Sequence, residues 1–151
     1  MNINTLTIKA QELLQSAMTL AHTKGQQALE PQHILATAIA DDNSLASYLF
    51  GRVGINIDTL RKQVAEAIER LPRVEGSESN IFFSRESSAV IQRAVELTHT
   101  FSDKYASIEH IIAAMAHERS VVRDILKHMG VTEEQLIAAI KEFRKGASID
   151  S

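Results

Sequence analysis

Apolar side chains recur every three or four residues through most of the chain, which is the spacing that places them on one face of an α-helix. The first such segment begins at Thr7, whose hydroxyl can cap a helix start, and ends near Gly25. Its apolar residues are Ala10, Leu13, Leu14, Ala17, Leu20 and Ala21. The pattern predicts an amphipathic helix of about five turns.

Three more helices are predicted before the chain reaches its second proline. Pro31 suits the first turn of one helix, Ser44 can cap the next, and Asn56 or Asp58 can begin the fourth. Pro72 ends the fourth helix, because proline has no amide hydrogen to continue the helical bonding.

The same order of residues then returns at a constant offset, here called the repeat offset, which pairs Thr7 with Ser84. After one deleted residue, an offset shorter by one pairs Gly54 with Gly130. Further pairs are Gln15 with Gln92, Ala17 with Ala94, Leu20 with Leu97, His22 with His99, and His33 with His110. Self-similarity at a fixed spacing is typical of repeat architectures. We therefore predict an all-α fold of two tandem, pseudo-twofold related four-helix repeats, about eight helices in one compact domain.

The comparison of the two halves also sets the expected boundaries. The domain should span residues 1–145, with repeat one at 7–71, an inter-repeat loop at 72–83 and repeat two at 84–145. Residues 146–151 are expected to begin a linker. The predicted helices of repeat two are 84–101, 107–117, 120–129 and 132–144, the last opened by a capping box of Thr132 and Gln135.

Charge and composition exclude several classes of protein. The 151 residues hold 16 Lys and Arg against 19 Asp and Glu, a net charge of -3, so a nucleic-acid partner is not expected. There is no cysteine, which fits a reducing compartment. No apolar run approaches the roughly 20 residues that a membrane helix needs. We expect a cytoplasmic domain with no membrane partner.

The motifs of common catalytic sites are missing as well. The chain has no G-x-x-x-x-G-K-[ST] phosphate loop and no H-x-x-x-H or H-E-x-x-H spacing. We therefore expect no catalytic residue, no metal site and no cofactor in this chain. Because His22 and His99 hold equivalent places, as do His33 and His110, we assign all four a structural role, the second pair by hydrogen bonding between helices.

Four segments carry a family resemblance. They are 6–11 (LTIKAQ), 26–35 (QQALEPQHIL), 71–76 (LPRVEG) and 103–111 (DKYASIEHI). Together they resemble the double repeat of the Clp (Hsp100) N-terminal domain, over nearly the whole chain. Segment 71–76 and the ending 143–148 (FRKGAS) resemble the ClpB-type disaggregases rather than the protease-linked ClpA and ClpC types.

This resemblance implies a substrate-recognition domain of an ATP-dependent disaggregase. Such a domain captures exposed segments of unfolded or aggregated proteins and delivers them to an AAA+ ring. It also implies that ATP and Mg bind in modules outside this chain, and that the parent protein forms a homo-oligomeric, hexameric ring working with an Hsp70 system. The isolated domain is expected to be a monomer.

The resemblance implicates three polar residues in substrate binding: Thr7, Asp103 and Glu109. Ser84 is the counterpart of Thr7 in repeat two, and both begin helices whose free amides favour anions. A client also offers apolar side chains, so we expect an apolar trough beside these polar groups. Our candidates for its lining are Leu13, Val90, Ile91 and Tyr105, although core packing would explain the spacing of Leu13 and Ile91 equally well.

Two features leave alternatives open. The apolar residues Ile81, Phe82 and Phe83 follow a polar loop, so they either join the two repeats or lie in the groove as a client mimic. The basic residues Lys141, Arg144 and Lys145 suit the C-terminal end of a helix, and we assign them no binding partner.

Two other functions are consistent with the family. In ClpC-type relatives a helix start and the acidic residue of a Glu-His pair together bind phosphoarginine. Ser84 and Glu109 match that pattern, but repeat one has Gln32 in place of the acidic residue. The first alternative is therefore an adaptor- or phosphoarginine-binding domain of a ClpC/ClpA-type protease unfoldase. The second is a structural helical repeat that aids ring assembly.

Overall fold

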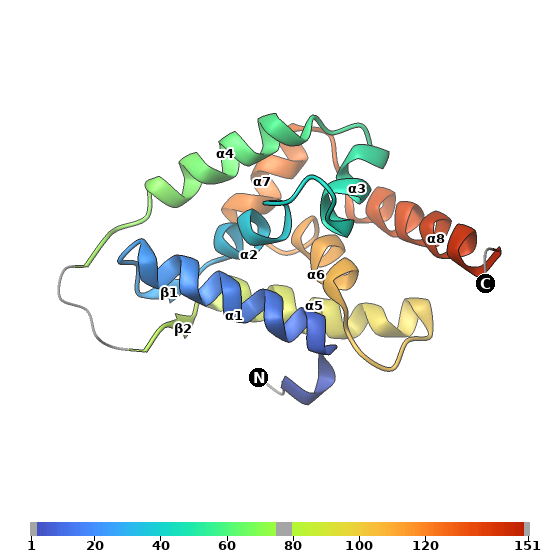
Figure 1. Ribbon diagram of the computed structural model, residues 1–151, viewed down its shortest axis with the longest axis horizontal. Helices are drawn as coiled ribbons and strands as arrows, with labels where there is room; N and C mark the ends of the chain where they lie inside the picture. The colour runs from blue at the N-terminus through green and yellow to red at the C-terminus, as the bar shows by residue number, and fades with distance from the viewer. Residues whose placement is uncertain (1–2, 75–79, 150–151) are drawn as a thin grey trace.

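Helices account for most of the computed structural model, which describes residues 3–74 and 80–149 (Figure 1). Repeat one contains α1 (Ile8–Thr23), α2 (Pro31–Ala38), α3 (Leu45–Arg52) and α4 (Ile57–Glu69). Repeat two contains α5 (Arg85–Phe101), α6 (Ile108–Met115), α7 (Val121–His128) and α8 (Glu133–Ile149). These eight helices confirm the predicted fold class.

Most helix starts lie where the capping residues predicted them. Thr7 Oγ1 accepts a hydrogen bond from the amide of Ala10 at 3.1 Å, which satisfies one of the free donors of α1. Ser44, Asn56 and Ser84 cap α3, α4 and α5 in the same way, and the capping box of Thr132 and Gln135 opens α8. These interactions span only three residues, which is why the sequence predicts them well.

The end of α8 differs from the prediction. The helix continues to Ile149, whereas we expected it to end at Arg144 and to be followed by a linker from residue 146. A single glycine costs a helix only about 1 kcal/mol relative to alanine, so Gly146 does not have to stop it. By contrast, Gly25 adopts a left-handed backbone (φ 69°) just after α1.

Short backbone ladders join the two repeats, and the sequence did not predict them as strands. β1 (Ala28–Leu29) pairs in parallel with β2 (Phe82–Phe83), and a single bridge links Leu6 to Ala106. A 3-10 helix, η1 (Ile3–Thr5), precedes that bridge. The pairing of β2 supports the interpretation that residues 81–83 join the repeats.

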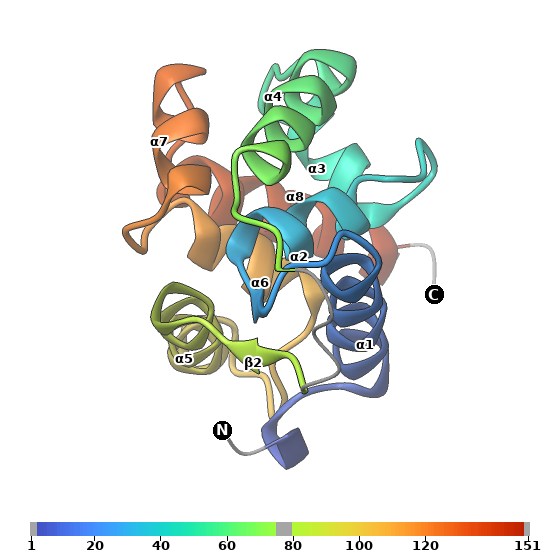
Figure 2. The same ribbon diagram turned by 90° about the vertical axis from the view of Figure 1, so that its left-hand side faces the viewer.

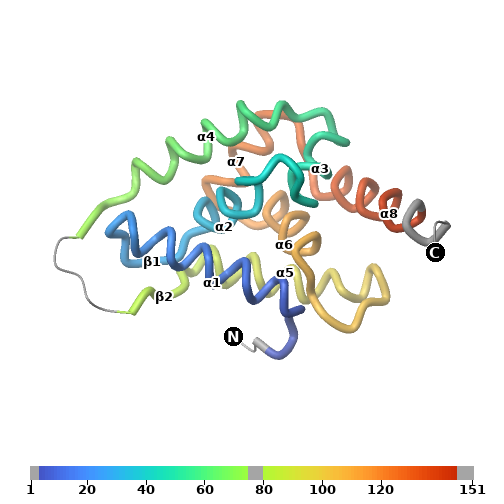
Figure 3. The backbone as a smooth tube through the Cα atoms, in the orientation of Figure 1, coloured from blue at the N-terminus to red at the C-terminus, as the bar shows by residue number. Residues whose placement is uncertain are grey.

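The two ladders are related to each other by the repeat offset. The amide of Thr7 donates to the carbonyl of Ala106 at 2.9 Å, and the amide of Ser84 donates to the carbonyl of Leu29 at 3.1 Å. Each repeat therefore begins against a loop of the other. The tube in Figure 3 shows the turn before α6 passing close to the start of α1.

The core lies between the two repeats. α2 and α6 occupy the middle of the molecule, with α1 and α5 on one side and α4 and α7 on the other (Figure 2). Ile34 and Leu35 of α2 and Ile111 and Ile112 of α6 are fully buried. Their apolar side chains are buried between the outer helices, which is the stable environment for them.

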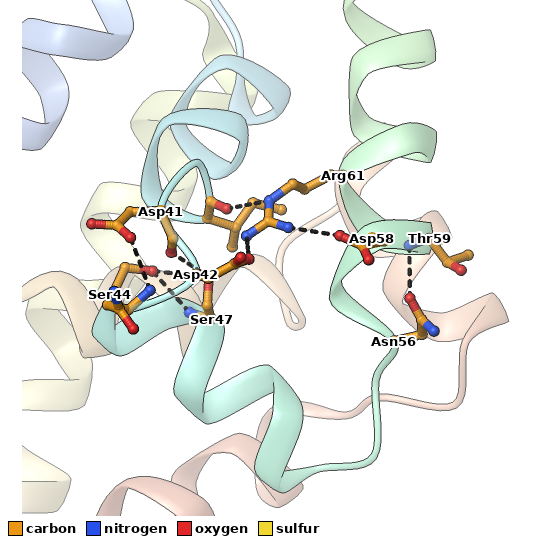
Figure 4. A network of polar contacts seen from close by, with 10 residues as sticks. Asp41, Asp42, Ser44, Ser47, Asn56, Asp58, Thr59 and Arg61 are labelled. Atoms are coloured by element: carbon orange, nitrogen blue, oxygen red, sulfur yellow. Dashed lines mark hydrogen bonds and ion pairs between the residues drawn. The ribbon is translucent and has the colours of Figure 1, made fainter.

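A polar network fixes α4 to the loop that follows α2 (Figure 4). Arg61 of α4 donates from Nε to the carbonyl of Ile39 at 2.7 Å, and its guanidinium pairs with Asp42 and Asp58. One arginine thus satisfies a carbonyl at the end of α2 and orients the loop between α2 and α3.

Candidate functional site

Three segments that are distant in sequence meet at the start of α6. They are the start of α1, the turn 102–107 and the end of α8. The turn is held to α1 because Ala106 accepts from the amide of Thr7 and donates to the carbonyl of Thr5, both at 2.9 Å. The predicted polar site residues Thr7 and Asp103 belong to the first two segments, and Glu109 lies in the first turn of α6 itself.

The end of α5 sets the position of Asp103. Ser102 adopts a left-handed conformation (φ 56°), which few residues other than glycine, asparagine and aspartate adopt readily. The amide of Asp103 then donates to the carbonyl of Thr98 at 2.8 Å, which closes the helix end. Asp103 is thereby held at the edge of the turn rather than in free solvent.

Arg144 of α8 bridges the two carboxylates of the site. Its Nη1 lies 3.0 Å from Oδ1 and 2.8 Å from Oδ2 of Asp103, and its Nη2 lies 3.1 Å from Oε2 of Glu109. Its Cζ also lies 4.8 Å from the centre of the Phe101 ring, a cation–π distance. Although burial opposes it, hydrogen bonding to the two carboxylates raises the pKa of Arg144 above its usual value.

His110 lies beneath this cluster and is fully buried. Its Nδ1 accepts from the amide of Ser107 at 2.8 Å, so in the neutral ring the proton is on Nε2. Nε2 lies 2.8 Å from Oδ2 of Asp103, an ion-pair distance without the alignment of a hydrogen bond. Burial lowers the pKa of His110, against the opposite effect of Asp103, so the neutral form is favoured.

Repeat one contains a neutral version of the same arrangement. His33 Nδ1 accepts from the amide of Glu30 at 2.9 Å, and its Nε2 lies 2.6 Å from Oε1 of Gln26. Gln26 in turn donates to the carbonyl of Ile68 at 2.8 Å. Burial lowers the pKa of His33 to about 4. These bonds give His33 and His110 a structural role, but their partners lie in the segment before each histidine's own helix, not on another helix as we predicted. His22 and His99, which we had assigned the same role, are exposed.

Ser84 is less accessible than the sequence suggests. Its residue is buried, and its hydroxyl accepts a hydrogen bond from the amide of Ser87 at 3.0 Å. Burial raises the pKa of the nearby Glu30 carboxyl, against the opposite effect of the Ser84 hydroxyl. Ser84 is therefore a buried cap of α5.

The predicted apolar trough is only partly at the surface. Val90 and Ile91 are 0% and 1% exposed, because they lie on the face of α5 that packs into the core, and this corrects their assignment to an open trough. Leu13 lines a groove of about 280 Å³ together with Leu45 and Ile108. Tyr105 is 45% exposed on the turn before α6.

Sequence reasoning missed two residues of this region. Ile8 is 73% exposed in the first turn of α1, directly after Thr7. The sequence could have indicated Ile8, because it is an apolar residue that lies off the apolar face of the predicted helix. Arg144 was assigned only to the end of a helix, and nothing local in the sequence indicates its contacts with Asp103 and Glu109.

Within residues 3–74 and 80–149, no helix has the length and apolar character needed to span a membrane. In the same part of the chain, no group of three or more histidines, aspartates and glutamates is arranged to hold a metal ion.

Comparison with known proteins assigns the class of domain. The family described as Clp repeat (R) N-terminal domain matches residues 5–129, and the chain belongs to this family. Among individual proteins, the whole chain is 42% identical to the chaperone protein ClpB of Porphyromonas gingivalis and 40% identical to that of Bacteroides thetaiotaomicron. It spans 17% of the length of each of these relatives. The predicted resemblance to the ClpB type is confirmed.

Solved structures support the same fold. The N-terminal domain of Hsp104 from Candida albicans superposes with a TM-score of 0.79 at 22% identity, covering 92% of this chain and 91% of the other. A ClpV N-domain in complex with a VipB peptide superposes with a TM-score of 0.69 at 19% identity, covering 89% of this chain and 83% of the other.

Proposed function

We propose that this chain is the substrate-recognition domain of a ClpB-type, ATP-dependent disaggregase and that it captures exposed segments of unfolded or aggregated proteins. The observation that carries the proposal is the similarity to ClpB chaperones over the entire chain, 42% identical in one of them. The exposed apolar residues Ile8 and Tyr105, next to Thr7 and the turn that holds Asp103, support it.

The chemistry of this surface suits an unfolded segment. Such a segment offers apolar side chains together with backbone groups that lack partners. Ile8, Tyr105 and the groove beside Leu13 provide apolar contacts, and the helix start at Thr7 provides amide donors. The related ClpV N-domain forms a complex with a VipB peptide, which supports peptide binding by a domain of this fold.

Capture of this kind has to be weak and reversible. A surface that accepts many segments is not optimised for one of them. Its effect comes from tethering, because a client held near the ATPase ring reaches a high local concentration there. The ring itself, its hexameric state, its ATP and Mg, the Hsp70 system and the cytoplasmic location are predictions that follow from the family.

The test is a backbone amide NMR titration of the domain with a permanently unfolded client protein, with free phosphoarginine in parallel. We expect client-induced shifts at Thr7, Ile8 and residues 103–109. Tyr105→Ser should weaken binding several-fold, whereas Tyr48→Ser is a matched control, since Tyr48 is 47% exposed on α3. No response to the client would contradict the proposal and favour a purely structural repeat.

The phosphoarginine arm tests the protease-linked alternative. Gln32 argues against it, because glutamine in repeat one replaces the carboxylate that would pair with the guanidinium. Shifts centred on Ser84 and Glu109 with phosphoarginine, without a response to the client, would replace our proposal with that alternative.

A further inference from the structure

Arg144 occupies part of the surface that the proposed function assigns to the client. It lies 41 residues beyond Asp103 and 35 beyond Glu109, so the contact depends on the path of α8. The carboxylates of Asp103 and Glu109 face the same guanidinium. They are here called the carboxylate pair.

The carboxylate pair forms a cation site. Two acidic side chains approach one point, and the Phe101 ring covers one side of the guanidinium at 4.8 Å. His110 adds no positive charge in its neutral form, which its buried bond to the amide of Ser107 requires. Without Arg144 the site would therefore hold two adjacent negative charges.

The Arg144 contact is open to exchange. The Arg144 side chain is 31% exposed, and those of Asp103 and Glu109 are 26% and 14% exposed. Ion pairs that reach solvent contribute little to stability, because water and salt compete with them. Another cation can reach the carboxylate pair from solvent and compete for it.

The first repeat offers a natural comparison. The repeat offset places Gln26 and Gln32 at the positions of Asp103 and Glu109. The offset shorter by one, which relates the fourth helices, places Ile68 at the position of Arg144, and the carbonyl of Ile68 accepts from Gln26 at 2.8 Å. Where the carboxylates are absent the arginine is absent too, so the cation site is a specific feature of repeat two.

We propose that Arg144 is a displaceable internal ligand of the carboxylate pair, and that a cationic side chain of a client segment takes its place during capture. The inference rests on the proposed function, since the client is the partner. Arg144 then acts as a competitor that sets the affinity of the site. Because binding couplings are reciprocal, capture of a cationic client releases the end of α8 from Asp103 and Glu109.

The test compares peptide binding by Arg144→Gln and Arg52→Gln. Arg52 on α3 is an exposed control, whose nearest carboxylate, Glu142, lies 3.9 Å away. The probes are unstructured Gly-Ser peptides with blocked ends, carrying three arginines, three lysines or three glutamines. Affinity is measured by amide NMR titration at low salt, and thermal unfolding checks that each variant folds.

We expect Arg144→Gln to bind the arginine or lysine peptide at least about fivefold more tightly than the parent chain, at the low end of usual coupling strengths. The glutamine peptide and the Arg52→Gln variant should show no such gain. Adding Glu109→Gln to Arg144→Gln should remove it. Equal or weaker binding of both cationic peptides by a folded Arg144→Gln variant would overturn the proposal.

Arg144→Lys keeps the charge but loses the planar fork, so it should give a smaller gain, and it serves as the test if Arg144→Gln does not fold. Failure of this inference is distinct from failure of the proposed function. If the unfolded client binds but neither variant gains affinity for cationic peptides, only the inference is overturned. If the variants gain that affinity and the unfolded client does not bind, the cation site stands and client capture is overturned.

Discussion

Gln26 and Asp103 hold the same place in the two repeats, and each places an oxygen atom against Nε2 of a buried histidine. The distances are 2.6 Å from Gln26 to His33 and 2.8 Å from Asp103 to His110. One oxygen belongs to a neutral amide and the other to a carboxylate. Together with Glu109, which replaces Gln32, this difference gives repeat two the two carboxylates that pair with Arg144.

The neutral character of repeat one can be tested with Gln26→Glu. The change removes the donor to the carbonyl of Ile68 and buries a carboxylate with no arginine beside it. We expect the free energy of unfolding to fall by about 3 kcal/mol at pH 7, since a buried charged group without a partner is costly. Urea denaturation measures the loss. Gln27→Glu is the control, because Gln27 is exposed, and a similar loss there would contradict the explanation.

The buried histidines predict a loss of stability in mild acid. Burial lowers the pKa of His33 to about 4, below its ordinary value of 6.5. Between these two values the unfolded chain binds a proton that the folded chain does not, so acid favours unfolding. Stability should decrease as the pH falls from 6.5 towards 4, by at most about 1.4 kcal/mol per pH unit for this residue. Urea denaturation at several pH values measures the slope.

The contribution of His33 is isolated by comparing two variants. His33→Gln should lower stability at pH 7 and flatten the slope between pH 6.5 and 4. Gln15→Ala, on the exposed surface of α1, changes no titratable group and should leave the slope as it is in the parent chain. An unchanged slope in His33→Gln would show that groups other than His33, such as His110 or the carboxylates, cause the acid sensitivity.

Thr7 is predicted to act in binding as well as in capping. Thr7→Ala should cost about 1 kcal/mol of stability, because it removes the acceptor of the Ala10 amide. It should also weaken client binding several-fold. Ser120→Ala is the matched control, because Ser120 caps α7 by accepting from the amide of Arg123 at 3.1 Å. Equal effects of the two variants on client binding would show that Thr7 acts only as a helix cap.

Glu109→Gln separates charge from capping at the same surface. It removes one carboxylate from Arg144 but leaves the capping bonds of α6, which involve Ser107 and His110, unchanged. We expect weaker binding of a cationic client and a stability change of at most about 1 kcal/mol, since the pair is partly exposed. A large loss of stability with unchanged binding, measured by thermal unfolding and titration, would assign Glu109 a structural role only.

The two phenylalanines of β2 should differ in their effect on stability. Phe83 is partly buried and packs on the core, whereas Phe82 is 59% exposed. Phe83→Ala should lower the free energy of unfolding by about 2 kcal/mol, and Phe82→Ala by no more than about 0.5 kcal/mol. Chemical denaturation measures both. If Phe82→Ala proved as costly, Phe82 would have an internal contact in solution.

Local interactions explain how much of the fold the sequence predicts. The caps at Thr7, Ser44 and Ser84 join residues three positions apart, and the apolar spacing depends on helix geometry alone. The predicted end of α8 was wrong, because Gly146 is compatible with either the end of a helix or its continuation. The two-residue strands were missed because such short pairing depends on where the partner lies, not on strand propensity.

The candidate site was harder to predict for a related reason. Val90 and Ile91 share one helical face, but periodicity does not say whether that face meets solvent or core. Arg144 contacts Asp103 across 41 residues, so no local pattern reports it. The polar candidates Thr7, Asp103 and Glu109 came from the family resemblance, and their role in binding stays a prediction.

The crossed ladders between the repeats have a consequence for how the chain folds. Each half supplies the hydrogen-bonding partner for the start of the other, at Ala106 for Thr7 and at Leu29 for Ser84. Such an exchange of identical contacts is the geometry of a twofold symmetric dimer. A half-length chain with one repeat would leave one partner open and is expected to associate with a second copy of itself. The full chain resembles a dimer fused into one polypeptide, whose halves should unfold together in a single transition.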